Sequence, residues 1–166
     1  MQQIRNANNT TNTDVVNKFY VTANQTQSIA QASVKYLVEL TSQGSQNSLY
    51  FIPTSVDTTK TPRFIALTFT VIDKDETASP TTGRIKFYDA TGKLDTYPMG
   101  FYHYKIYEQT SSSNLDPANA TELEEGIAYV RDYDGNMEEI TPDFKEYNPT
   151  VNQYVYPWWT NTTLVL

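Results

Sequence analysis

The chain has 166 residues and no cysteine, so it can bury one core without disulfides and offers no thiolate ligand to a metal. It carries 19 acidic against 12 basic residues, a formal charge of −7, which opposes binding to nucleic acid and to anionic membrane surfaces. Its 13 tyrosines and 7 phenylalanines favour β-strands. No apolar run approaches the roughly 20 residues that span a bilayer. Together with the negative charge, this means that neither nucleic acid nor a membrane is expected as a partner.

Residues 1–14 are polar and rich in Asn and Thr. Such a segment cannot by itself bury enough apolar surface to offset its ordering entropy. It also lacks the apolar region of a secretory signal, so we expect synthesis in the cytoplasm. We predict an N-terminal arm over residues 1–14 that either packs on its own domain or docks on a neighbouring chain.

From residue 15 onward, short strand-like runs alternate with turn signals. The expected strands are 18–22, 34–40, 48–52, 63–73, 84–88, 101–109 and 127–130, with 137–141 returning after a hairpin turn at Asp134-Gly135. The polar segment between the second and third strands has the composition of a hairpin loop. With neither heptads nor a fixed-period repeat, this pattern predicts an antiparallel sandwich or barrel over residues 15–153.

Two strands show where the core lies. Segment 63–73 alternates apolar residues with threonine, as a half-buried strand does. Segment 101–109 also alternates, but both its faces carry aromatic residues, so it is either central in the sandwich or covered by a partner. The residues that we predict to share one core are Leu67, Phe69, Tyr104, Ile106 and Val130.

The polar segments between the expected strands contain no clear catalytic or metal-binding site. Asp116-Pro117 suits the start of a helical turn, which Gly126 is expected to end. The Asp132–Asn136 segment resembles half of a calcium loop, but its glycine comes fourth rather than sixth and its twelfth residue is Asp143, so the hairpin turn is favoured. Residues 73–76 are expected to form a solvated acidic loop.

The only histidine, His103, lies in a strand pattern, and the chain has no serine elbow and no glycine-rich phosphate loop. Paired carboxylates for glycoside hydrolysis are not excluded, but no sequence feature selects a pair. We expect no catalytic residue, no metal and no cofactor.

The last residues, 154–166, form an aromatic and apolar tail. Its aromatic rings could stack on sugars, but such residues more often close a core or lie at an interface. We hypothesise that both ends of the chain contact other chains. The expected interface residues are Ile4, Tyr154, Tyr156, Trp158, Trp159, Leu164 and Leu166. In the alternative, the tail adds a strand to its own sandwich, with both tryptophan rings in the core.

Residues 100–130 resemble a pattern found in small virion proteins of tailed phages, including crAss-like and other phages of Bacteroidetes. The pattern is a tyrosine-rich strand, a serine-rich loop with Asn-Leu-Asp-Pro, and a Glu-x-Gly that leads into a closing strand. The residues that carry it are Tyr104, Ile106, Tyr107, Glu108, Asn114, Leu115, Asp116, Pro117, Glu125, Gly126 and Val130. The resemblance implies an immunoglobulin-like β-sandwich with extended terminal arms and without catalytic residues.

On this basis the expected function is that of a non-enzymatic structural protein of the virion. The resemblance favours an auxiliary capsid protein on a phage head, whose partners are the major capsid protein and copies of itself. A neck or tail component is the alternative within the same class. A carbohydrate-binding module with the aromatic tail as its platform is the alternative from another class.

Overall fold

The computed structural model describes residues 1–7, 13–22, 26–61, 64–87 and 97–131, all of which belong to one compact unit. These residues form β-strands, loops and two short 3-10 turns, without an α-helix, which confirms the expected all-β class for this part of the chain. None of the described helical turns is long and apolar enough to cross a membrane. The strands are β1 (Gln2–Arg5), β2 (Val15–Val21), β3 (Lys35–Ser42), β4 (Ser48–Phe51), β5 (Ser55–Thr61), β6 (Phe64–Val71), β7 (Arg84–Ile85), β8 (Gly100–Gln109) and β9 (Thr121–Arg131).

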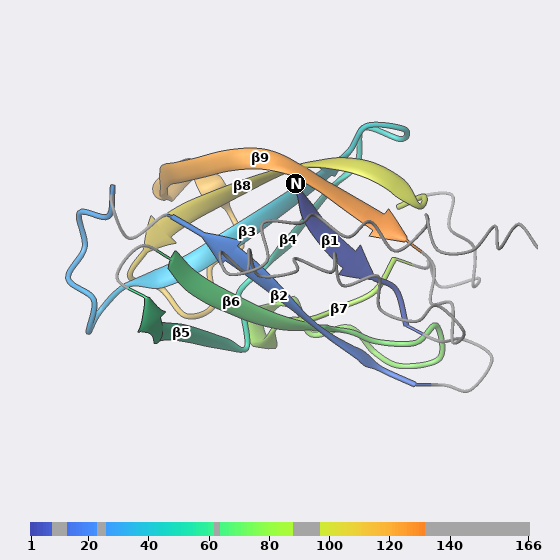
Figure 1. The fold of residues 1–166 in the computed structure, drawn as a ribbon, viewed down its shortest axis with the longest axis horizontal. Helices are drawn as coiled ribbons and strands as arrows, with labels where there is room; N and C mark the ends of the chain where they lie inside the picture. Colours follow the sequence, from blue (N-terminus) through green and yellow to red (C-terminus); the bar gives the residue numbers. More distant parts are fainter. Residues whose placement is uncertain (8–12, 23–25, 62–63, 88–96, 132–166) are drawn as a thin grey trace, which may run out of the picture. The chain divides into compact units, whose positions relative to one another are not determined.

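The strands form two sheets (Figure 1). The larger has the order β1-β9-β8-β3-β4, and the smaller has the order β2-β6-β5, with β7 paired to the end of β6. The expectation of a wholly antiparallel fold is wrong for two pairs, because β1 runs parallel to β9 and β7 runs parallel to β6. Parallel neighbours need a long connection, and both pairs are separated by one in the sequence.

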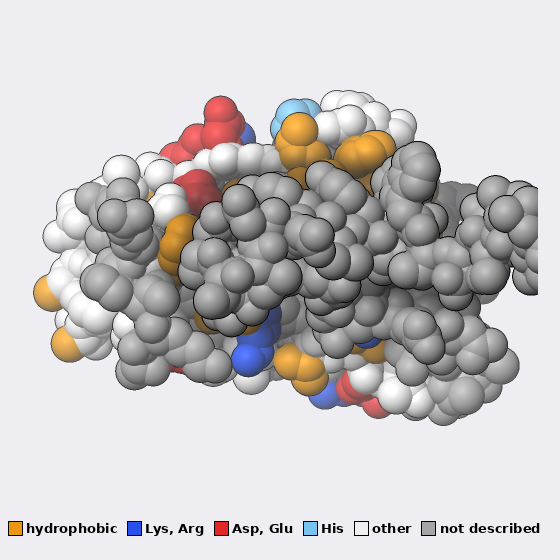
Figure 2. Space-filling model, viewed as in Figure 1, with side chains coloured by type: hydrophobic (Ala, Val, Ile, Leu, Met, Phe, Trp, Pro, Cys, Tyr) orange, Lys and Arg blue, Asp and Glu red, His pale blue; other side chains and the backbone are white. Residues whose placement is uncertain are grey.

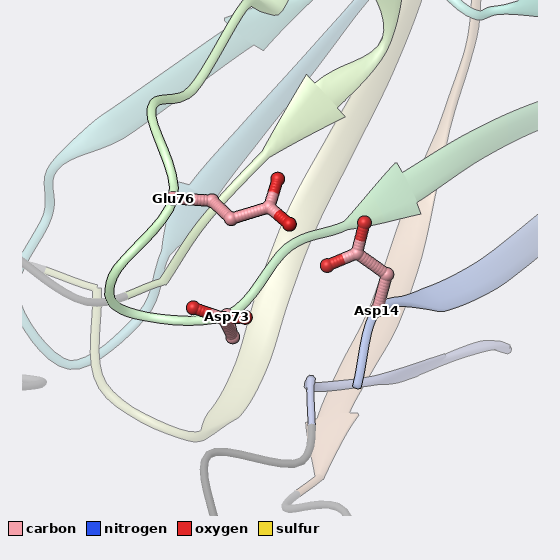
Figure 3. A group of neighbouring side chains, drawn as sticks. All are labelled: Asp14, Asp73 and Glu76. Carbon is pink, nitrogen blue, oxygen red and sulfur yellow. The ribbon is translucent and has the colours of Figure 1, made fainter. Parts of the chain in front are cut away.

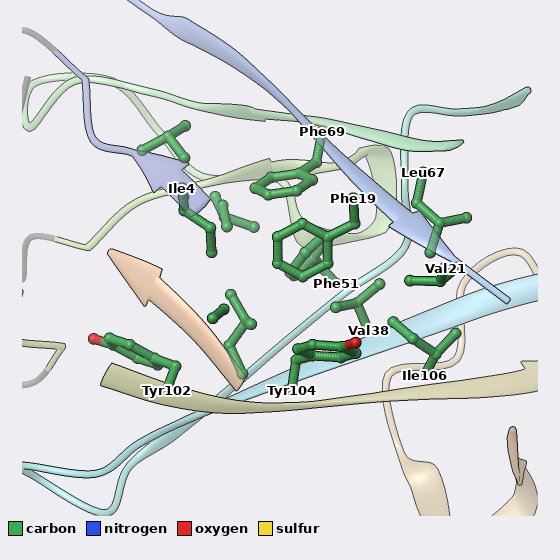
Figure 4. Close-up of a cluster of buried hydrophobic side chains, with 14 of the residues drawn as sticks. Ile4, Phe19, Val21, Val38, Phe51, Leu67, Phe69, Tyr102, Tyr104 and Ile106 are labelled. Atoms are coloured by element: carbon green, nitrogen blue, oxygen red, sulfur yellow. The ribbon is translucent and has the colours of Figure 1, made fainter. Parts of the chain in front are cut away.

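The two sheets pack face to face on one core. Phe19 of β2 packs edge-on against Phe69 of β6, with 5.2 Å between ring centroids, and lies 5.5 Å from the ring of Tyr104 of β8. These aromatic rings therefore join the two sheets (Figure 4). The predicted core residues Leu67, Phe69, Tyr104, Ile106 and Val130 all lie buried in this cluster, which confirms that prediction.

The first strand shows that residues 2–5 of the expected arm pack on the chain's own domain, one of the two alternatives for this segment. Residues 2–5 pair with β9 along four residues, and Ile4 is fully buried in the core cluster. In this conformation Ile4, one of the expected interface residues, is buried in the core of its own chain. A single apolar residue among polar ones shows no readable alternation, and only the free edge of β9 makes this segment a strand. Residues 8–12 of the expected arm lie outside the described residues.

The hairpin of β8 and β9 corrects the role of Gly126. The helical turn begins as predicted, with the Asp116 carboxylate accepting a hydrogen bond from the Ala118 amide at 2.9 Å, but it covers only Pro117–Asn119. Gly126 lies within β9 instead, directly opposite Tyr104. A Cβ atom at this glycine would lie 2.6 Å from the Tyr104 hydroxyl oxygen and 2.7 Å from its ring. The glycine thus leaves room for an aromatic ring.

Candidate interaction surface

The outer face of the larger sheet carries apolar side chains that pack on no other described strand. Cross-strand pairing sets Phe101 beside Tyr129 and His103 beside Ile127. Phe101 is 51% exposed, Ile127 is 42% exposed and Tyr129 is partly exposed. Figure 2 shows hydrophobic side chains next to the histidine on this face. We call Phe101, Ile127 and Tyr129 the outer apolar strip.

The strip is held in place by its own contacts. The rings of Phe101 and Tyr129 lie 5.0 Å apart, tilted by 56°. Both side chains stand on neighbouring strands of a paired hairpin, so little conformational entropy remains to be lost on binding. Large aromatic side chains of this kind are enriched at the centres of protein interfaces. This part of the surface is therefore suited to binding another protein.

The other end of the same face is covered by the chain itself. Leu37, Ile52 and Tyr107 form a small buried cluster, against which Leu115 and Ala120 of the β8–β9 connection pack. This connection is braced where it leaves β8, because the side-chain amides of Gln109 and Asn114 bond to one another at 3.0 Å. The loop therefore shields one end of the outer face, and of the described residues none covers Phe101 and Ile127 fully.

Between the covered end and the strip lies the carboxylate of Glu39. It accepts hydrogen bonds from the hydroxyls of Tyr107 at 2.6 Å, Tyr50 at 3.1 Å, and Ser48 and Thr41 at 3.2 Å. Burial alone would raise the pKa of Glu39, but these hydrogen bonds outweigh it and hold the pKa below its usual value. Burial and the neighbouring carboxylate raise the pKa of Tyr107. The carboxylate is thus a charged group that links β3, β4 and β8, not a proton donor at neutral pH.

A cluster of three carboxylates lies at the edge of the smaller sheet. Asp14 precedes β2, while Asp73 and Glu76 lie in the loop after β6, with their carboxylate oxygens within 4.8 Å of one another (Figure 3). The expectation of a solvated loop is wrong for Asp73, which is 3% exposed and accepts a hydrogen bond from the Asp75 amide. The Arg84 guanidinium bonds to Asp14 at 3.1 Å and also to Glu76. The arginine therefore supplies positive charge where a cation would bind.

Only some of the residues that the sequence singled out lie in the described part of the chain. His103 is exposed on β8, and its ring lies 3.2 Å from the side-chain amide of Gln43. The other expected interface residues, Tyr154, Tyr156, Trp158, Trp159, Leu164 and Leu166, lie outside the described residues, as does the Asp134-Gly135 hairpin turn. Tertiary structure adds the outer apolar strip, which the sequence signalled only through the aromatic residues on both faces of segment 101–109.

No family model matches the chain, and neither the curated proteins nor the solved structures contain a significant match to it.

Proposed function

We propose that the chain is a non-enzymatic structural protein of the virion, an auxiliary capsid protein on the head of a tailed bacteriophage. The outer apolar strip carries this proposal, because it presents adjacent large side chains on a rigid sheet. In this role the strip binds the major capsid protein or another copy of the chain. A neck or tail component would use the same strip against a different virion protein.

The proposed fold is an immunoglobulin-like sandwich, which the strand order supports. Sheets with the orders β2-β6-β5 and β9-β8-β3-β4 correspond to the B-E-D and G-F-C-C′ strands of variable-type immunoglobulin domains. The Tyr102 hydroxyl, near the start of β8, donates to the Pro98 carbonyl at 2.7 Å, as in the tyrosine corner of such domains. Two residues later, where antibody domains have a disulfide cysteine, Tyr104 packs on Phe19 instead.

The non-enzymatic part of the proposal draws on how the described carboxylates are used. The buried Glu108 accepts hydrogen bonds from the amides of Ser28 and Ile29 at 2.9 Å each, so it holds a loop in place. A pocket of about 310 Å³ beside β3 has only Lys35 and Tyr36 as titratable groups in its lining. The Tyr36 hydroxyl already bonds to Gln27, and burial raises its pKa. This pocket lacks a carboxylate or imidazole for general acid–base chemistry.

The virion assignment draws on the resemblance of residues 100–130. In the fold this segment is β8, the Pro117–Asn119 turn and β9, one continuous hairpin. The same hairpin carries the outer apolar strip and the loop that bounds it. A resemblance that is clearest in the hairpin with the strip supports a shared mode of attachment through this surface.

The test compares two double variants that each remove one exposed aromatic and one exposed aliphatic side chain. Phe101→Ser with Ile127→Ser alters the strip, while Tyr20→Ser with Val16→Ser alters the outer face of β2, where Tyr20 is 54% exposed and Val16 is 63% exposed. Each purified protein is mixed with phage heads that lack it and is sedimented with them. We expect the strip variant to lose about tenfold or more in affinity for the heads, and the control to bind like the wild type.

Thermal unfolding of both variants establishes that the fold is kept. Equal binding of the strip variant and the wild type would overturn the assignment of the strip as the attachment surface. Binding to tails and not to heads would favour the neck or tail role. Saturable binding of isolated glycans by the wild-type protein, without binding to heads, would favour a carbohydrate-binding module instead.

A further inference from the structure

The N-terminal strand lies in a groove between the edges of the two sheets. Figure 1 shows β1 between β9 and β2. On one side, β1 and β9 pair in parallel from the Gln2–Ala128 pair to the Arg5–Arg131 pair. The larger sheet therefore ends in a strand of only four residues, from a part of the chain more than 100 residues away in sequence from β9.

On its other side, β1 is bound through side-chain amides rather than a backbone ladder. The Asn17 amide of β2 accepts a hydrogen bond from the Arg5 backbone N–H at 2.8 Å and donates one to the Arg5 carbonyl at 3.0 Å. The Gln2 side chain donates to the Tyr20 carbonyl at 2.7 Å and accepts from the Tyr20 amide at 3.4 Å. Each side-chain amide bonds to a backbone N–H and a backbone carbonyl, as a peptide group would. Because one of the two amides is that of Gln2, the groove recognises an extended strand whose first residue is glutamine.

The third contact is apolar and sets the register. Ile4 is fully buried among residues of both sheets, whereas Met1 and Gln3 are exposed. A shift of one residue along the groove would bring the polar Gln3 or Arg5 into the core. The groove therefore selects a strand with an aliphatic residue two positions after the glutamine. Every copy of this chain carries that segment at its N-terminus.

One feature of the docked strand is unfavourable. Asn6 is fully buried, and its side-chain oxygen and nitrogen have no hydrogen-bond partner among the described residues, although its backbone amide donates to the Arg131 carbonyl at 2.9 Å. A buried amide without partners costs free energy. This residue directly follows β1, at the end of the segment that pairs with β9.

We propose that the groove between β9 and β2 is a strand-acceptor site that binds the N-terminal strand of a second copy of the chain. The exchanged strand makes the same contacts with Asn17, Tyr20 and β9 as the intramolecular one, as in other domain swaps. Residues 6–14 connect β1 to β2 and reach about 30 Å when fully extended, enough to cross to a neighbour. The proposal does not depend on the outer apolar strip or on the virion assignment.

The test uses the full chain with Ile4→Asp, which places a carboxylate in the core and releases β1 while leaving the acceptor residues unchanged. The matched control is Met1→Asp on the same segment, where the side chain is 77% exposed. A fluorescent peptide of residues 1–7 is titrated into each protein. We expect saturable binding to the Ile4→Asp chain, weaker binding to the control, and about tenfold or more loss of affinity when the peptide itself carries Ile4→Asp.

The second arm mixes labelled Ile4→Asp chain with the wild-type chain and follows the label by sedimentation velocity. We expect a mixed complex, in which wild-type chains donate β1 to the variant. If the variant is unfolded alone, recovery of its near-ultraviolet circular dichroism on addition of the wild-type peptide supports the proposal equally. Failure of the peptide to bind or restore the variant would overturn the acceptor site. Peptide binding without a mixed complex would overturn the second copy as its occupant.

Discussion

The inner and outer faces of β8 carry similar side chains in different surroundings. On the inner face, Tyr102, Tyr104 and Ile106 are buried against the smaller sheet. On the outer face, Tyr107 donates a hydrogen bond to Glu39 and lies in a cluster covered by the β8–β9 loop, while Phe101 is half exposed. The inner face is required for folding, because it forms the core. The uncovered part of the outer face contributes little to folding, so its aromatic residues are available for binding.

The largest expected difference between the faces is in the free energy of unfolding when one phenylalanine is removed from each face. Phe69→Ala removes a fully buried ring that contacts Phe19 and Phe51, and we expect it to lower the free energy of unfolding by about 3–5 kcal/mol. Phe101→Ala should change it by less than about 1 kcal/mol. Chemical denaturation of both variants measures the contrast. Similar losses in the two variants would mean that the outer strip also belongs to the folding core.

The second expected effect depends on how closely Tyr104, on the inner face of β8, packs against Gly126 of β9. Gly126→Ala places a Cβ against the Tyr104 ring, so we expect a loss of about 1–3 kcal/mol in the free energy of unfolding. Gly44→Ala is the control, because its Cβ would lie 3.4 Å from the nearest atom, in ordinary contact. If Gly126→Ala proves neutral, the ring of Tyr104 is free to move and the inner face is less tightly packed than the structure indicates.

At the covered end of the outer face, we expect the Tyr107 hydroxyl to contribute to the stability of the fold. Tyr107→Phe removes the 2.6 Å hydrogen bond to Glu39, and we expect it to lower the free energy of unfolding by about 1 kcal/mol. Tyr20→Phe, on an exposed side chain of the other sheet, is the control and should be close to neutral. Equal stability of Tyr107→Phe and the wild type would show that this hydrogen bond does not contribute to the free energy of unfolding.

A pH-dependent effect is expected at the polar end of the inner face. Burial opposes the charge of Glu108, but hydrogen bonds from Ser28 and Ile29 outweigh it and hold its pKa below the usual value of 4.5. Because the folded pKa is lowered, the stabilisation is complete above the unfolded pKa and is lost as the pH falls through the folded pKa. Unfolding free energies measured from about pH 6 to pH 3 should fall less steeply in Glu108→Gln than in the wild type. Parallel pH profiles would contradict this role of Glu108.

The smallest effect is expected at the acidic cluster at the edge of the smaller sheet. Arg84 already neutralises part of the charge of Asp14 and Glu76. We therefore expect calcium in excess over EDTA to change the Tm by no more than about 1 °C, since only a ligand that binds the folded state stabilises it. An increase of several degrees, abolished by Asp73→Asn, would identify a calcium site.

The alternation of apolar residues was sufficient to predict the all-β class, the core strands and the five core residues. It also indicated that segment 101–109 has two apolar faces, although not which end of the outer face is covered. β5 was not predicted, because its sequence, SVDTTKT, is mainly polar and lacks that alternation. The start of β9 was placed six residues too late, since its first residues are mostly acidic and their pairing depends on the neighbouring β8.

What the sequence by itself determined is local: which residues alternate, where the Asp116-Pro117 turn begins, and which strands have apolar faces. Pairing between distant segments was decided only in the tertiary structure. Ile4 becomes a core residue because β9, more than 100 residues away, offers a free edge, and Gly126 is needed because Tyr104 lies opposite it. The outer apolar strip likewise exists only because register places Phe101 beside Tyr129. Short-range sequence patterns show the alternation within each strand. The register between strands, and which segment pairs with a free sheet edge, depend on contacts between segments far apart in the chain.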